Sequence, residues 1–289
     1  MIPPDTALVR QTQARGLSLP LDILVATPNA RRPSKLIKPH VFSGSLPDNS
    51  FVDIGDGLFV SSPELSYFQM ANELSFIKLI ELGFELCGSY SRPAHNSGEK
   101  YRYDREDKCV YNLPKLTNFK KLSVFTQRMK SINGYIRAKK ALPYIADGSG
   151  SPMETVLVML LTMPYRYGGY GLPMPRLNSP VVPIKSARQL SNKDYFKCDL
   201  FWHDYLLAAE YDSEEYHNNP YRMAEDAKRR NTLASLGIFP VTVTKQQIFN
   251  ISDFEMIAMQ LASGLNKRLK HKKPGFVEAQ RELRVLLLP

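Results

Sequence analysis

The sequence contains few cysteines. It has three in 289 residues, at positions 87, 109 and 198, and none of these lies at the short spacing of a structural zinc site. A low, odd number of widely separated cysteines also argues against a disulfide framework, and it is typical of a reducing compartment.

Long apolar runs are missing as well. The longest, "TVLVMLLTM" at 155–163, is too short to cross a bilayer, which takes about 20 residues. The first residues, "MIPPDTALVRQ", have no apolar core of the kind found in signal peptides. We therefore expect a cytoplasmic protein that has no membrane partner.

What the sequence does have is an excess of positive charge. Lysine and arginine number 38 against 28 aspartate and glutamate residues, which gives a formal charge of +10 and a pI of about 9.4. Such a balance usually indicates a nucleic-acid partner. Association with ribosomes or an anionic surface, or solubility alone, is the alternative.

The composition and the apolar periodicity of the sequence change several times along the chain. Residues 21–60 consist of short β-like runs between Pro, Gly, Asn and Asp, and apolar side chains then recur at three-residue steps from Leu65 to Ile80, as in one amphipathic helix. We predict an N-terminal arm at 1–20, a small α+β unit at 21–90, a basic and partly helical connecting region at 91–145, an α/β domain at 146–273 and a C-terminal tail at 274–289.

Basic residues concentrate in two places, the connecting region and the end of the last predicted helix. They form either a solvated helix face or a surface that contacts phosphates, and composition does not separate the two. The candidates are Lys120, Lys121, Arg128, Lys130, Arg137, Lys139 and Lys140, followed by Lys267, Arg268 and Lys270.

From residue 149 onward the sequence predicts a helix, a loop, three strands, a helix, a strand and a helix. Ser151 is the expected N-cap of the first helix, and Glu154 completes a capping box. Ser252 and Glu255 form a second capping box at the last helix. The first strand, "SPVVPIK", is expected at a sheet edge because of its prolines.

The next two strands, "KCDLFW" and "YLLAAEY", form a hairpin that contains carboxylates. A tight turn near His203–Tyr205 places Asp199 opposite Glu210, with Cβ atoms roughly 5 Å apart. Alternation puts Asp212 on the same face. The other face, which includes Cys198, carries no charge, so we expect helices on both sides of the sheet.

Carboxylates this close repel one another. Burial adds a separate desolvation cost of several kcal/mol per ion. A retained proton or a cation relieves the repulsion. Mg²⁺ or Mn²⁺ prefers oxygen ligands and supports the hydrolysis of phosphodiesters. The alternative is that each acid pairs with a lysine or arginine at a strand end.

Residues 149–265 resemble a known family. The matching pieces are Asp199, "EYDS" at 210–213, a following histidine, a helix with the pattern D-x-x-R-x-x-x-L-x-x-x-G, the strand "VTVT", and a preceding "SPME" helix. This pattern resembles the small endonuclease-like proteins related to very-short-patch repair enzymes, within the PD-(D/E)XK nuclease superfamily. The resemblance implies a restriction-endonuclease-like α-β-α core with a mixed sheet. It also implies a metal-dependent nuclease that acts on DNA, its expected partner, in a bacterial defence, repair or mobile-element setting.

The same resemblance implies roles for single residues. Asp199 and Glu210 would be the principal metal ligands. Glu154 would be an additional acid, although the capping box explains it equally well. Asp212, another catalytic candidate, stands where much of the superfamily has a lysine, so the group that orients the attacking water is not identified.

The residues that follow the hairpin leave further alternatives. Ser213 replaces the family's glycine. His217 would be either a proton shuttle or a helix cap. Asp226 and Arg229, one helical turn apart, form a structural ion pair in this interpretation.

Residues 21–71 show a weaker likeness to the C-terminal region of abortive-infection type IV antitoxins. His40, Leu46-Pro47 and Ser62-Pro63 match, whereas Glu64-Leu65 stand in place of the usual Arg-Thr. The likeness implies a protein partner for this unit. The second functional hypothesis is therefore a catalytically inactive nuclease fold that binds nucleic acid or regulates, as in toxin-antitoxin systems.

Overall fold

The computed structural model describes residues 9, 12, 15–17, 19–42, 44–93, 108–181, 195–212, 220–270 and 274–288, and for 220–226 the backbone alone. Within them the protein is mixed α/β, as predicted. The chain divides into a unit of residues 1–48 and a larger unit of residues 49–289.

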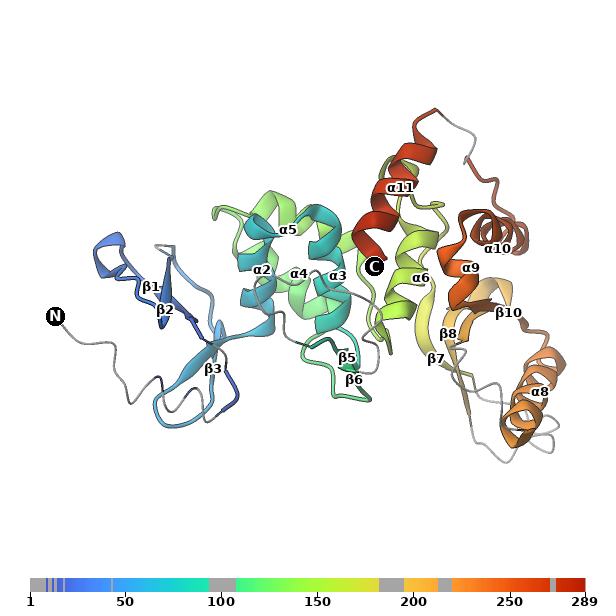
Figure 1. Ribbon diagram of the computed structural model, residues 1–289, viewed down its shortest axis with the longest axis horizontal. Coiled ribbons are helices and arrows are strands. Elements are labelled where there is room, and N and C mark those ends of the chain that lie inside the picture. The colour runs from blue at the N-terminus through green and yellow to red at the C-terminus, as the bar shows by residue number, and fades with distance from the viewer. Residues whose placement is uncertain are drawn as a thin grey trace. The chain divides into compact units, whose positions relative to one another are not determined.

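The smaller unit contains a two-stranded parallel sheet. β1 (Leu21–Val25) pairs with β2 (Ile37–Val41), and a 3-10 turn at Pro28–Ala30 lies between them. Both strands were expected from the sequence (Figure 1).

The larger unit begins with the hairpin of β3 (Phe51–Asp53) and β4 (Phe59–Ser61), followed by two helices. The sequence predicted one helix here, and this is wrong: α2 (Pro63–Glu73) ends before α3 (Phe76–Leu86) begins. Ser75 is the reason, because its Oγ accepts the N–H of Lys78 at 3.3 Å and its extended backbone starts a new helix.

The basic region is helical, as predicted. α4 (Phe119–Arg128) and α5 (Tyr135–Ala141) pack with α2 and α3 into a helical cluster (Figure 1). The Tyr67 hydroxyl, buried in this cluster, donates to the Ala138 carbonyl at 3.1 Å. The short strands β5 (Tyr90–Ser91) and β6 (Val110–Tyr111) pair beside it.

The remaining elements follow the predicted order from residue 149 onward. They are α6 (Pro152–Thr162), the 3-10 turn η4 (Tyr165–Tyr167), β7 (Arg176–Val181), β8 (Phe196–Trp202), the 3-10 turn η5 (His203–Tyr205), β9 (Leu207–Asp212), α8 (Pro220–Ser235), β10 (Phe239–Thr244), α9 (Lys245–Phe249), α10 (Ile251–Gly264) and α11 (Phe276–Leu287). The segment that the sequence set apart as a tail thus contains α11, which packs on η4, α3 and α6.

Four of these strands form one mixed sheet in the order β10-β9-β8-β7. β7 and β8 are antiparallel, β8 and β9 are antiparallel, and β9 and β10 are parallel. Leu200 lies opposite Ala209, so the predicted hairpin register is confirmed, and β7 lies at an edge, as its prolines indicated.

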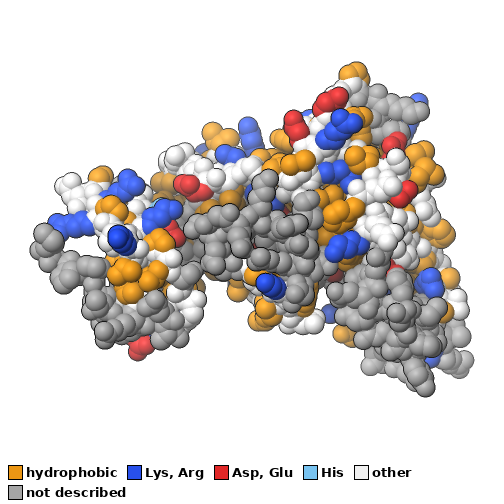
Figure 2. Space-filling model, in the orientation of Figure 1, with side chains coloured by type: hydrophobic (Ala, Val, Ile, Leu, Met, Phe, Trp, Pro, Cys, Tyr) orange, Lys and Arg blue, Asp and Glu red, His pale blue; other side chains and the backbone are white. Residues whose placement is uncertain are grey.

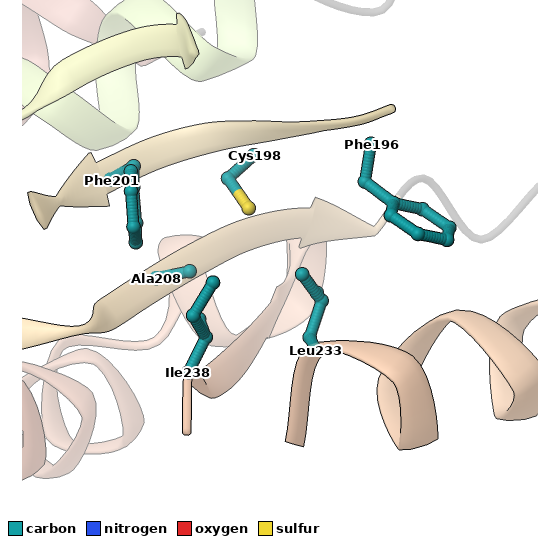
Figure 3. Close-up of a cluster of buried hydrophobic side chains, with 6 residues drawn as sticks. All are labelled: Phe196, Cys198, Phe201, Ala208, Leu233 and Ile238. Atoms are coloured by element: carbon teal, nitrogen blue, oxygen red, sulfur yellow. The ribbon is translucent and has the colours of Figure 1, made fainter. Parts of the chain in front are cut away.

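Helices pack on this sheet through apolar side chains. α6 contacts β8 and β9, while α8, α9 and α10 contact β10. Figure 3 shows Phe196, Cys198 and Phe201 projecting from β8 toward Leu233 of α8.

The side chains of β8 do not alternate as the sequence predicted. Cys198 was expected on the face opposite Phe201, but both lie in the same buried cluster (Figure 3). The β8–β9 ladder ends at Leu200 and Ala209, and beyond it the Asp199 carboxylate accepts the N–H of Tyr211. The strand is therefore irregular next to Asp199, where a side chain takes a backbone donor.

One predicted cap is also wrong. α10 begins at Ile251, and the N-cap is Asn250, whose Oδ1 accepts the N–H groups of Ser252 and Asp253 at 2.9 and 3.2 Å. Asparagine caps a helix as well as serine does, and it comes first in the chain.

In the part of the chain that the structure describes, no helix combines the length and the apolar character needed to cross a membrane.

Candidate functional site

Three acids that influence one another electrostatically lie in the first turn of α6, in β8 and in β9. They are Glu154, Asp199 and Glu210, all largely buried. The negative charge of Asp199 adds to the rise in pKa that burial causes at both glutamates. The structure therefore brings the three acids that the sequence singled out into one electrostatic cluster.

Asp199 is the centre of this cluster. Its Oδ2 accepts the Tyr211 N–H at 2.8 Å. Burial raises the pKa of Asp199, although the Tyr211 N–H and the Arg229 guanidinium act in the opposite direction. The carboxylate is consequently held by the neighbouring strand at the point where the ladder opens.

Glu154 is positioned by the first turn of α6. Ser151 is the N-cap, as predicted, and its Oγ accepts the Glu154 N–H at 3.1 Å. The Glu154 carboxylate does not complete the predicted capping box: its Oε2 accepts from Gly150 N at 2.8 Å and from Asn178 Nδ2 at 2.6 Å. Burial, with the charge of Asp199 second, raises the pKa of Glu154 to about 8.

Asn178 is a site residue that the sequence reasoning missed. It lies in β7 with a left-handed backbone (φ 46°), and its Nδ2 also donates to the Gly148 carbonyl at 3.0 Å. Asparagine tolerates this conformation better than most residues. Nothing in the sequence around it distinguishes such an asparagine from an ordinary turn residue.

Glu210 has one satisfied oxygen and one that is not. Oε2 accepts from Arg229 Nη2 at 2.6 Å, and Oε1 is buried with no hydrogen-bond partner among the described residues. Burial raises the pKa of Glu210 to about 7, and the charge of Asp199 adds to the rise. Arg229 and a hydrogen bond from the Cys198 thiol oppose it.

Arg229 forms an ion pair with Glu210, which the sequence reasoning did not predict. The sequence predicted an ion pair with Asp226, whose side chain lies outside the described residues. The Nη2 of Arg229 also donates to the Lys197 carbonyl. Glu210 therefore follows the alternative in which an acid pairs with a lysine or arginine at a strand end.

Two further candidates lie at or beyond the end of β9. Asp212 is half-buried and stands opposite Thr244 in the parallel pair with β10. His217 lies outside the described residues.

A hard divalent cation such as Mg²⁺ requires oxygen ligands. All three acids offer oxygen, and Glu210 Oε1 is a buried acceptor without a donor. Among the described residues, however, no three His, Cys, Asp or Glu side chains are grouped to ligate one ion. Asn178 and Gly150 hold Glu154, while Arg229 holds Glu210. Since Mg²⁺ often takes one or two carboxylates plus water, Asp199 with one glutamate supplies enough ligands of the right kind.

The predicted nucleic-acid residues lie mostly at the surface. Lys120, Lys121, Arg128, Lys130, Lys139, Lys140, Lys267, Arg268 and Lys270 are exposed, and Arg137 is half-buried. Figure 2 shows lysine and arginine side chains scattered over the visible face without forming a continuous strip. A hollow of about 470 Å³ at the start of α4 is lined by Lys115, Lys120, Lys121 and Asp147, among others.

Comparison with known proteins gives two relatives, both from Mycobacterium tuberculosis. They are "Uncharacterized protein Rv2248" from strain H37Rv and "Uncharacterized protein MT2308" from strain CDC 1551. Each is 34% identical over 115 residues, which is 38% of this chain and 36% of the relative. The match thus spans about a third of the length of these relatives. No family model and no solved structure matches the chain.

Proposed function

We propose that this protein is a metal-dependent nuclease that hydrolyses phosphodiester bonds in DNA. The observation that carries the proposal is the burial of Glu154, Asp199 and Glu210 in one cluster, where the charge of Asp199 raises the pKa of both glutamates. Burying ionisable groups in this way destabilises the folded state, and a group of acids with perturbed pKa values is typical of functional sites.

The arrangement of elements supports the proposal. Helix α6, the three antiparallel strands β7 to β9, helix α8 and the parallel strand β10 occur in the order expected of a restriction-endonuclease-like core. We infer that the larger unit has this core, and the resemblance to very-short-patch repair endonucleases points to a bacterial defence, repair or mobile-element setting.

In the proposed site Asp199 and Glu210 or Glu154 hold Mg²⁺ or Mn²⁺. When bound, such an ion polarises a phosphoryl oxygen and lowers the pKa of a water molecule. Glu154 and Glu210 must be ionised to serve as ligands, so they release protons on binding. Asn178 fixes the Glu154 carboxylate through its Nδ2, and the Tyr211 N–H fixes that of Asp199.

Isosteric substitution of the central acid tests the proposal. We expect Asp199→Asn to lower cleavage of linear, supercoiled or single-stranded DNA, in Mg²⁺ or Mn²⁺, by about 100-fold or more, because the amide is a poor ligand. The control is Asp204→Asn, which removes a 93% exposed carboxylate in the turn of the same hairpin. Equal cleavage by parent and Asp199→Asn would assign the activity to a contaminant and end the claim.

A second candidate function is a catalytically inactive regulator that binds nucleic acid. The ion pair of Arg229 and Glu210 favours it, because an arginine neutralises an acid that a nuclease would give to the metal. This candidate predicts DNA binding without cleavage and a melting temperature that Mn²⁺ does not change. A metal-dependent nuclease would instead cleave the DNA, and Mn²⁺ would raise its melting temperature.

A further inference from the structure

We propose that Arg229 contacts the substrate: its Nη2 holds Glu210, and its Nη1 donates to a phosphate oxygen of the nucleic acid. This inference rests on the proposed function, because it names the group that meets the phosphodiester beside the three carboxylates. It also assigns a cation to a site whose strand β9 carries Asp212, and no lysine, two residues after Glu210.

The contacts of Arg229 leave part of its guanidinium available. Nη2 donates both to Glu210 Oε2, at 2.6 Å, and to the Lys197 carbonyl. Within the described part of the chain, Nε and Nη1 make no hydrogen bond, and the side chain is 34% exposed. With Nη2 occupied, Nη1 presents N–H donors that can form a charge-assisted hydrogen bond to a phosphate oxygen.

Electrostatics gives the reason why a cation is needed there. A phosphodiester that approaches Glu154, Asp199 and Glu210 meets a cluster of negative charge, which one divalent ion offsets only in part. The charge of Arg229 acts on both Asp199 and Glu210. Its position at the junction of β8, β9 and α8 is fixed before substrate arrives, so little side-chain entropy is lost on binding.

The simpler explanation is an ion pair that only ties α8 to the sheet. The two explanations differ in what a loss of Arg229 does to DNA affinity in a protein that remains folded. The neighbouring Arg230 provides a control of equal charge, since it is exposed on the same helix.

The experiment uses the full chain with Arg229→Gln, Arg229→Lys and Arg230→Gln. Melting temperature reports folding, electron paramagnetic resonance of free Mn²⁺ reports metal binding without DNA, and fluorescence anisotropy of a labelled 20-nucleotide DNA in Ca²⁺ or EDTA reports binding. We expect Arg229→Gln to weaken DNA binding about 10-fold or more, and Arg230→Gln about 2-fold. Arg229→Lys, which keeps the charge but cannot hold Glu210 and phosphate together, should retain the melting temperature and lose most of the affinity.

Equal losses in Arg229→Gln and Arg230→Gln, or full DNA affinity in Arg229→Lys, would overturn the inference. If Arg229→Gln does not fold, the DNA affinity of Arg229→Lys decides between the two explanations. Failure of the proposed function gives a different result, because the parent would then neither cleave DNA nor bind Mn²⁺. In that case a loss of DNA affinity in EDTA that is specific to the Arg229 variants would still support the phosphate contact.

Discussion

At the scale of the residue, Glu154 shows what a buried carboxylate costs. Its carboxylate has two donors, Gly150 N and Asn178 Nδ2, but no cation is bonded to it in the described part of the chain. Two hydrogen bonds do not replace the water that burial removes, and its pKa rises from 4.5 to about 8. At neutral pH the metal-free protein thus keeps a proton on this group.

The raised pKa predicts how stability depends on pH. Between about pH 5 and pH 8 the unfolded chain has lost the Glu154 proton and the folded chain retains it, so the free energy of unfolding decreases as pH rises through this range. Glu154→Gln removes the penalty. We expect the variant to exceed the parent by about 2 kcal/mol or more at pH 8 in EDTA, and by much less at pH 5.

Denaturant unfolding at the two pH values measures this difference. The matched control is Glu282→Gln, which makes the same chemical change at an exposed position of α11. A stability difference that stays constant between pH 5 and pH 8 would contradict the predicted protonation of Glu154.

At the scale of the element, short-range signals predicted most helices and strands. The N-cap Ser151, the hairpin turn near His203–Tyr205 and the β-rich segments all lie where the sequence put them. Two of the wrong predictions have a common cause. Ser75 and Asn250 each start a helix through the hydrogen bonds of a single side chain, and the apolar periodicity of the sequence does not reveal such a cap. The segment after 273 was missed because α11 is stabilised by its contacts with η4 and α6.

The contact between η4 and α11 makes a prediction about Gly168. This residue has φ 85°, and a Cβ there would overlap the backbone of Ala279 in α11. We expect Gly168→Ala to lower the free energy of unfolding by about 2–4 kcal/mol, because the strain of φ > 0 adds to a clash with backbone that cannot move aside.

Gly57→Ala separates the two effects. Gly57 has a similar φ of 72° but nothing within 4 Å of an added Cβ. Its substitution should cost only the backbone strain, about 1 kcal/mol. Denaturant unfolding of both variants measures the difference, and equal losses would show that α11 does not pack tightly on η4.

At the scale of the whole molecule, a formal charge of +10 favours contact with polyanions such as nucleic acid. Exposed lysines on α4 and α5 contribute to it, and the described structure does not use them for folding contacts, apart from Lys139, whose ammonium lies 5.6 Å from the centre of the Tyr135 ring. Electrostatic binding of this kind carries little sequence information.

We expect DNA affinity to decrease steeply between 50 and 200 mM salt. If Lys120 and Lys121 each contact a phosphate, their joint replacement by alanine should lower the slope of log K against log salt by about two, because each contact releases roughly one counterion. The control replaces Lys35 and Lys38, two exposed lysines of the smaller unit, and changes the charge equally. An unchanged slope in the Lys120 and Lys121 variant would remove α4 from the binding surface.

The sequence by itself determined the order of elements from α6 to β10 and the hairpin register of β8 and β9, because N-capping and turn chemistry act over a few residues. Only the tertiary structure decided that Asn178 holds Glu154 and that Arg229 pairs with Glu210. These contacts join residues far apart in the chain, and they depend on how α6, β7 and α8 pack around the open end of β8 and β9. No local pattern encodes such packing, so the partners of the buried acids became visible only in three dimensions.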